Sequence, residues 1–292
     1  MSSDIKSVTV IGAGVLGSQI AYQSAYCGYS IVAYDVNEQA LEAGRARFGE
    51  LVSIYEREVA GAAGGRARAA LARISYSSDL ATAVSDADLV IEAAPEKLEL
   101  KRELYGQLDQ YAPETTIFAS NSSTLLPSEL AASTGRPDRF LALHFVVQVW
   151  THNIAEIMAH PGTDPEVYKS VVEFARSIGM EPIEVHKERP GYVSNSLLVP
   201  WLFAAIDLVA TGVADPETID KTWRISSGAP VGPCELLDVI GLVTPYNIMT
   251  ASPDESTRAN ARYLKEHYID KGKLGRASGE GFHSYPPVAR AA

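Results

Sequence analysis

A histidine and a glutamate are the two residues of this chain best suited to moving a proton. His144 ends the apolar run 139–144, and Glu156 is the acid inside the apolar run 153–158. An imidazole ordinarily titrates near neutrality, so it can accept a proton and return it. If the two runs are neighbouring strands, Glu156 can pair with the imidazole, orient it and stabilise its protonated form. The alternative is a core histidine and an unrelated glutamate at a strand edge.

A serine follows another apolar run and is a further candidate for the same site. Ser123 lies in the turn Asn121-Ser122-Ser123-Thr124, directly after the run 116–119. A side chain in such a turn faces the cleft at the edge of a sheet, where it can contact a substrate oxygen. A serine here could equally cap the short helix expected at 127–130. Both interpretations fit the residues.

A glycine-rich turn after the first apolar run points to a dinucleotide. It reads Gly12-Ala13-Gly14-Val15-Leu16-Gly17 and leads into an amphipathic segment. Gly12 permits a tight turn, Gly14 lets backbone approach a pyrophosphate, and Gly17 lets the following helix pack close to the strand. Val15 and Leu16 open that helix, whose unpaired N–H groups face the phosphates.

An acid at the end of the next apolar run narrows the choice of nucleotide. Asp35 follows the run 30–34, where a carboxylate can accept hydrogen bonds from both ribose hydroxyls. A 2′-phosphate would be repelled there, and no arginine follows before Arg45. A glycine turn alone is weak, because any α/β protein can contain one. The strand, helix and spaced acid together predict NAD as the cofactor, and therefore hydride transfer.

Composition limits the class of partner. The chain has 292 residues, 46% of them hydrophobic, and a net charge of −11, which argues against nucleic acid or an anionic membrane as the main partner. A small-molecule substrate is expected instead. Cys27 and Cys234 have no metal-ligand spacing, so we expect buried apolar side chains and no metal. The start 1–6 lacks the basic and apolar features of a signal peptide, and we expect a cytoplasmic protein.

Short β-branched runs alternate with helical patterns through the first two-thirds of the chain. This alternation requires crossover connections, so it predicts an α/β fold of the Rossmann type, with a doubly wound, mostly parallel sheet. The expected strands are 7–11, 30–34, 88–92, 116–119, 139–144, 153–158 and 182–186. The expected helices are near 15–28, 37–58, 98–110 and 164–178.

The connection 37–73 is unusually long and carries six arginines. It is expected to form a helical arm, broken at the glycines of 61–65, that projects from the sheet. One interpretation is a solvated helical face with local ion pairs. The other is a basic arm that covers a nucleotide-like substrate.

Pro190 and Gly191 indicate a domain boundary, so residues 1–189 are expected to form the NAD-binding domain and 190–292 an all-α domain. A long apolar helical pattern runs from Tyr192 to about Gly212. Polar residues and a proline interrupt it, which argues against a membrane span. A helix that is apolar nearly all round must be buried by other helices or by another subunit. We therefore expect the substrate cleft and a homodimer interface in this region.

Seven ordered motifs resemble the NAD-dependent L-3-hydroxyacyl-CoA dehydrogenase family over nearly the whole chain. They are Val10–Gly17, Val90–Ala93 with Glu96 and Lys101, Ser120–Ser123, Leu143–Phe145 with Glu156, Gly191–Asn195, Gly232–Asp238 and Gly275–Phe282. The resemblance implies His144 as general base, Glu156 as its partner, and Ser123 and Asn195 as polar contacts of the substrate. It also implies that Glu96 and Lys101 lie near the cofactor.

One departure from the family pattern affects the expected substrate. Members usually continue His-Phe-Phe-Asn-Pro, whereas this chain has Val147 in place of the Asn beside the nicotinamide. The segments 122–128 and 214–225 are especially similar to diketoreductase, a branch that acts on dicarbonyl esters. The leading expectation is a 3-hydroxyacyl substrate on CoA. The alternatives are a dicarbonyl ester, a gulonate-type sugar acid, and a catalytically silent NAD-binding protein.

Overall fold

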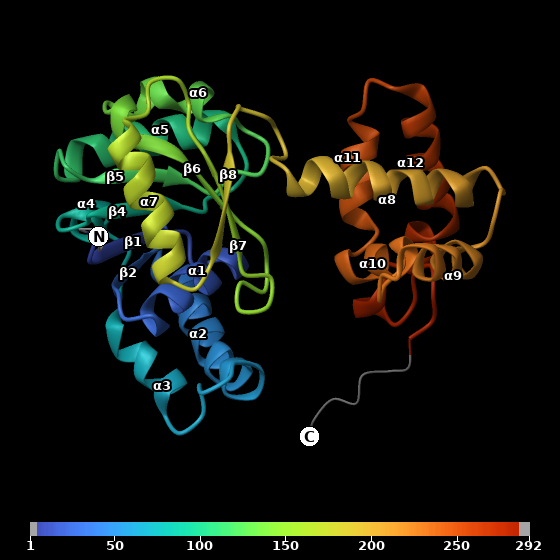
Figure 1. Ribbon diagram of the computed structural model, residues 1–292, viewed down its shortest axis with the longest axis horizontal. Helices are drawn as coiled ribbons and strands as arrows, with labels where there is room; N and C mark the ends of the chain where they lie inside the picture. The colour runs from blue at the N-terminus through green and yellow to red at the C-terminus, as the bar shows by residue number, and fades with distance from the viewer. Residues whose placement is uncertain (1–4, 286–292) are drawn as a thin grey trace. The chain divides into compact units, whose positions relative to one another are not determined.

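The computed structural model describes residues 5–285 of the chain, which packs as two compact units. The first unit ends at Val193 and the second begins at Ser194. Figure 1 labels the elements of both. The first unit contains the sheet, and the second is built from helices, as the sequence predicts.

The sheet of the first unit has eight strands in the order β3-β2-β1-β4-β5-β6-β7-β8. Neighbouring strands are parallel except β6 and β7, which are antiparallel. The chain order reverses between β1 and β4, the place where ligands bind in open α/β sheets. The strands are β1 (Ser7–Ile11), β2 (Ser30–Tyr34), β3 (Ile74–Ser77), β4 (Leu89–Glu92), β5 (Ile117–Ser120), β6 (Phe140–Phe145), β7 (Ile154–Met158) and β8 (Glu181–Val185).

Helices cover both faces of this sheet, because alternate side chains along its strands point to opposite faces and both sets are buried. In β4, Leu89 and Ile91 pack into one apolar cluster with α1 and α2, while Val90 packs into another with Tyr105 of α5. The helices of this unit are α1 (Val15–Tyr26), α2 (Glu38–Glu58), α3 (Arg66–Ala70), α4 (Leu80–Val84), α5 (Leu98–Tyr111), α6 (Pro127–Leu130) and α7 (Pro165–Ser177). The predicted long helices agree with α1, α2, α5 and α7 to within two residues at each end.

One strand of the sheet, β3, is not predicted from the sequence. It is four residues long, only Ile74 of its residues is buried, and it pairs with β2 at the edge of the sheet. So short a run with one buried side chain carries too little apolar pattern to stand out from the arm before it. The arm itself forms α2 and α3, separated by the glycine-containing break that the sequence predicts.

In the second unit, α8 packs against α10 and α12, and buried carboxylates fix the ends of neighbouring segments. Asp220 accepts hydrogen bonds from the N–H groups of Cys234 and Glu235 at the start of α10. Asp238 accepts from the N–H groups of Phe282 and His283. The helices are α8 (Ser194–Ala210), α9 (Pro216–Ser227), α10 (Pro233–Ile240), α11 (Val243–Thr250) and α12 (Glu255–His267).

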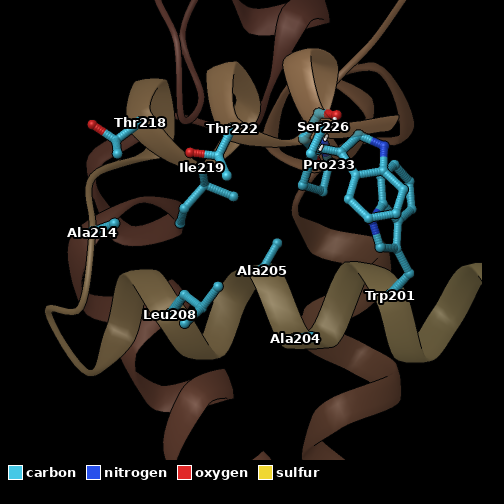
Figure 2. A pocket seen from close by; sticks show the side chains of 11 residues that line it. Trp201, Ala204, Ala205, Leu208, Ala214, Thr218, Ile219, Thr222, Ser226 and Pro233 are labelled. Carbon is cyan, nitrogen blue, oxygen red and sulfur yellow. Dashed lines mark hydrogen bonds between the residues drawn. The ribbon is translucent and has the colours of Figure 1, made fainter. Parts of the chain in front are cut away.

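An apolar cavity of about 340 Å³ lies between α8 and α9 (Figure 2). Trp201 and Leu208 reach it from α8, and Ile219 and Thr222 reach it from α9. Trp201 packs against Trp223 with 5.0 Å between the ring centroids. Within residues 5–285, no helix is both long enough and apolar enough to cross a membrane.

Candidate active site

The glycine turn occupies the point where β1 and β4 lie side by side. Gly12 has φ +100°, and a Cβ added there would lie 2.8 Å from the carbonyl oxygen of Ala93, which follows β4. A Cβ at Gly17 would lie 1.9 Å from the carbonyl oxygen of Gly12. A Cβ at Gly14 would meet no atom within 4 Å. Two of the glycines are therefore required by the fold, and the third faces open space at the start of α1, as a pyrophosphate site needs.

The acid after β2 is fixed against this turn. One carboxylate oxygen of Asp35 accepts from the N–H of Ala13 at 2.9 Å, and the other accepts from the N–H of Val36 at 2.8 Å. Arg47 of α2 reaches the same turn, where it donates to the carbonyl oxygen of Ala13 at 3.1 Å. The sequence predicts Arg47 only as one of the arginines of the arm, since nothing in its spacing shows that α2 folds back over the turn. The turn and the acid fit the adenosine half of NAD.

A buried ion pair joins the ends of β4 and β5 to α5. Glu92 and Lys101 are almost fully buried, and Lys101 Nζ donates to Glu92 Oε1 at 2.5 Å. The other oxygen of Glu92 accepts from the hydroxyls of Ser120 at 2.8 Å and Tyr105 at 3.2 Å. Every oxygen of this carboxylate therefore has a partner, as burial of a charge requires. The shortest contact of the Lys101 ammonium is thus with Glu92, inside this network.

Glu96 accepts three hydrogen bonds from the turn after β5. They come from Ser122 Oγ at 2.5 Å, the Thr124 N–H at 2.9 Å and Thr124 Oγ1 at 2.8 Å, and Lys101 Nζ lies 3.5 Å away. Burial raises the pKa of Glu96, but these hydrogen bonds and the Lys101 charge outweigh it, so the net pKa is lowered. Glu96 stays ionised and holds the turn that carries Ser123.

The proton-transfer pair forms where the sheet changes direction. In the antiparallel register of β6 and β7, His144 lies directly opposite Glu156, so both side chains lie on one face. His144 Nδ1 lies 3.0 Å from Glu156 Oε2, and His144 Nε2 lies 3.1 Å from Ser123 Oγ. Both partners of the pair are buried. The structure thus brings together three of the four residues expected around the substrate.

Two contacts that the sequence analysis did not assign hold this group. The ring of Tyr192 stacks on the imidazole of His144, with centroids 4.7 Å apart and planes 11° from parallel. Asn121 Oδ1 accepts from the N–H of Phe145 at 2.9 Å, which ties the turn after β5 to the end of β6. Tyr192 and Asn121 both lie in motifs of the family pattern, but the motifs do not say what either side chain touches.

The loop 146–153 carries the departure from that pattern. Gln148, with φ +62°, donates its N–H to Gln19 Oε1 of α1 at 2.7 Å, and Trp150 Nε1 donates to Glu58 Oε2 of α2 at 2.8 Å. Val147 is about half exposed, and its carbonyl oxygen lies 3.0 Å from the Nδ1 of His152. Two helices of the cofactor-binding half therefore fix this loop.

Asn195 and the cysteines complete the set of predicted residues. Asn195 lies in the first turn of α8, in the second unit, and its role toward substrate stays a prediction. Cys27 is half-buried and Cys234 is buried, and burial raises the pKa of both thiols. Among the described residues no cluster of histidine, cysteine and acidic side chains could hold a metal.

Comparison with known proteins identifies the family. Residues 7–189 match the NAD-binding domain of 3-hydroxyacyl-CoA dehydrogenase, and residues 191–285 match the C-terminal domain of the same enzyme. The chain belongs to the 3-hydroxyacyl-CoA dehydrogenase family. It is an NAD-dependent oxidoreductase, as the glycine turn and Asp35 predict.

Relatives of this dehydrogenase differ in the substrates that their names give. The mitochondrial hydroxyacyl-coenzyme A dehydrogenase of Rattus norvegicus is 37% identical over 288 residues, which cover 96% of this chain and 91% of the relative. A probable 3-hydroxybutyryl-CoA dehydrogenase of Bacillus subtilis is 37% identical, with 97% and 98% covered. A solved diketoreductase, described by its dual catalysis of dicarbonyl compounds, is 61% identical with a TM-score of 0.94, and 98% and 100% of the two chains are covered.

Replacing Asp35 by serine is expected to raise the Kd of NADH about tenfold or more, because charge-assisted hydrogen bonds to the ribose contribute about 1.5–3 kcal/mol. The ratio of NADPH to NADH affinity should rise as well, since the repulsion of a 2′-phosphate is removed. Fluorescence titration with both nucleotides measures the two constants. The exposed Asp86→Ser serves as matched control. An unchanged NADH Kd in D35S would remove Asp35 from the cofactor site.

Proposed function

We propose that this dehydrogenase interconverts 3-hydroxy and 3-oxo carbonyl compounds, with His144 as the acid and base. The observation that carries the proposal is the chain of contacts from the half-buried Ser123 through the buried His144 to the buried Glu156. The Nε2 atom of the imidazole lies toward Ser123, and the Nδ1 atom is hydrogen-bonded to the Glu156 carboxylate. This is the arrangement that a general base and its orienting partner need.

In the oxidative direction, His144 Nε2 takes the proton of the substrate hydroxyl. Glu156 stabilises the imidazolium that results, because its carboxylate lies on the opposite side of the ring. The hydroxyl of Ser123 donates a hydrogen bond to the substrate oxygen, and Asn195 is proposed as a second polar contact. When bound, NAD supplies the hydride acceptor, and NADH supplies the donor in the reverse direction. In reduction the imidazolium returns its proton to the new alkoxide.

The contacts made by the arginines of the arm indicate whether the arm could bind the phosphates of a CoA substrate. Five of the six contact nearby groups of the first unit: Arg45 contacts Glu42 and the Tyr76 ring, Arg47 the Ala13 carbonyl, Arg57 Glu58, Arg66 the Tyr26 ring, and Arg73 the Gly28 carbonyl. These contacts support a structural arm more than a site for the phosphates of CoA. Together with the likeness to diketoreductase, they favour a dicarbonyl ester over the CoA thioester as substrate.

The second unit is proposed to form a homodimer through the face of α8 and α9 that borders the cavity in Figure 2. Leu197, Trp201 and Leu208 recur on one side of α8, and Thr218, Thr222 and Ile225 recur on one side of α9. Leu197 is 70% exposed and Ile225 is 75% exposed. Large apolar side chains left in water on two adjacent helices are typical of a subunit interface.

The variant H144A is expected to lose turnover by about 10²–10⁴-fold, because a positioned acid and base contributes that much to the rate. Its NADH Kd should stay close to wild type. Glu156→Gln should fall between wild type and H144A, since the amide still accepts a hydrogen bond but carries no charge. Stopped-flow kinetics and nucleotide titration measure both variants, with the exposed His186→Ala as control. Near-wild-type turnover by H144A would reject the mechanism, whereas a wild type that binds NADH without turnover would support the catalytically silent alternative.

A panel of three oxidised substrates separates the proposed substrate classes. We expect a higher kcat/KM for a 3,5-dioxo ester than for acetoacetyl-CoA or a 3-oxo sugar acid, because five of the arm's six arginines already contact groups within the protein. NADH consumption at matched concentrations gives the three values. A tenfold preference for acetoacetyl-CoA would instead assign the enzyme to CoA thioesters.

The substitution Ile225→Glu is expected to convert a dimer into a monomer, because it places a charge in the centre of an apolar interface. The side chain is exposed within the chain, so folding should be unaffected. Sedimentation velocity measures the mass, and Tyr111→Glu, an exposed apolar position on α5, is the matched control. A monomeric wild type, or a dimeric I225E, would contradict the proposed interface.

A further inference from the structure

Three consecutive residues, 191–193, contact Ser123, His144 and Glu156, which together form the proton-transfer group. The Gly191 N–H donates to the carbonyl oxygen of Ser123 at 3.0 Å, and the Val193 N–H donates to Glu156 Oε1 at 3.0 Å. Between them, the Tyr192 ring lies flat against the imidazole of His144. The Tyr192 hydroxyl donates to the carbonyl oxygen of Ser122 at 2.8 Å. The segment 191–193 therefore contacts the turn after β5, the end of β6 and the middle of β7.

The backbone of Tyr192 is in a conformation that tyrosine rarely adopts. Its φ is +52°, and the residue is 99% buried. A bulky residue in the left-handed region persists only where the surroundings determine it, and such residues concentrate at functional sites. Gly191 before it, with φ +82°, also lies in the left-handed region. These two left-handed residues bring the Tyr192 ring against one face of the imidazole and direct the Val193 N–H at Glu156.

The hydroxyl of Tyr192 is a donor in this site and stays protonated. Burial raises the pKa of Tyr192, and the charges of Glu156, Glu96 and Glu92 raise it further. The proton is directed at a backbone carbonyl. Its ring, which covers one face of the imidazole, is the part of the residue that touches the proposed base.

The two hydrogen bonds of His144 leave one motion poorly restrained. Both are made at ring nitrogens, Nδ1 and Nε2, whose N–H group and lone pair lie in the ring plane, so they mainly resist sliding in that plane. Tilting about the line that joins the two nitrogens changes their lengths little. A flat ring packed on one face opposes this tilt directly.

We propose that Tyr192 is a positioning residue for the reaction, which holds the plane of the His144 imidazole so that Nε2 stays directed at the substrate oxygen. The proposal rests on the proposed function of His144. The aromatic ring does this work, and the hydroxyl serves to hold the ring against the turn that carries Ser123. A misplaced base slows proton transfer steeply, because small displacements from a reactive geometry cost large factors in rate.

The test compares Tyr192→Phe with Tyr192→Leu. Tyr192→Phe keeps the flat ring, so kcat should stay within about fivefold of wild type. Tyr192→Leu removes it, and kcat should fall about 10- to 100-fold while KM and the NADH Kd stay within about twofold. In Tyr192→Leu the solvent deuterium isotope effect on kcat should rise, because proton transfer becomes slower relative to the other steps.

A merely structural role gives a different result. It would lower the melting temperature and the fraction of enzyme that binds NADH, and it would leave the isotope effect of the remaining active enzyme unchanged. Tyr168→Leu, a half-buried tyrosine of α7 whose hydroxyl donates to Ile157, is the matched control for loss of a tyrosine from the first unit. If Tyr192→Leu is unstable, Tyr192→Met gives the same comparison with a larger flexible side chain.

The outcomes separate this proposal from the function on which it rests. Wild-type kcat and isotope effect in Tyr192→Leu or Tyr192→Met, with H144A inactive, would overturn the role of Tyr192 alone. A loss in Tyr192→Phe as large as that in Tyr192→Leu would also overturn it, since the ring would then not be the group that matters. Turnover by H144A at the wild-type rate would reject the proposed function itself.

Discussion

The antiparallel register of β6 and β7 is the constraint on which the proposed chemistry depends. It places His144 opposite Glu156, and a slip of one residue would turn the carboxylate to the other face of the sheet. Both side chains are buried, so each needs a hydrogen-bond partner there, and each provides one for the other. The change of direction in an otherwise parallel sheet therefore has a chemical consequence. It runs β7 back along β6, so that Glu156 of β7 lies across from His144 near the carboxyl end of β6.

Polar contacts then join the carboxyl ends of the strands into one edge. Glu92 at the end of β4 accepts from Ser120 at the end of β5, and Asn121 beyond β5 accepts from the N–H of Phe145 at the end of β6. Lys101 neutralises the buried Glu92. Each bond crosses from one strand to its neighbour, so the edge that carries the glycine turn also carries Ser123 and the base. A scaffold fixed in this way can hold reacting groups with little cost of reorganisation.

The sequence predicts those features that depend on local pattern. The β1 run, the glycine turn and α1 follow from apolar periodicity and from glycines that the observed geometry requires at 12 and 17. The His144–Glu156 pair needed an assumption that their strands are neighbours, which periodicity cannot supply. Tyr192 could not be assigned, because its contact with His144 joins residues 48 positions apart through a left-handed backbone turn. The contact of Arg47 with the glycine turn could not be predicted for the same reason, since it depends on how α2 folds back. Long-range packing, not local propensity, decides such contacts.

The position of Val147 shows how a site can change its chemistry while keeping its geometry. The loop around it is held by the hydrogen bond from Gln148 to α1, by the hydrogen bond from Trp150 to α2, and by the fully buried Val149. None of these contacts involves the side chain of residue 147. An exchange at this position removes none of these contacts and changes the side chain that the loop presents. The family pattern has an amide here, with a donor and an acceptor, and this chain presents a half-exposed apolar side chain. On the proposed mechanism, polar recognition of the substrate oxygen then rests more heavily on Ser123 and His144, which makes their exact placement the stricter requirement in this member of the family.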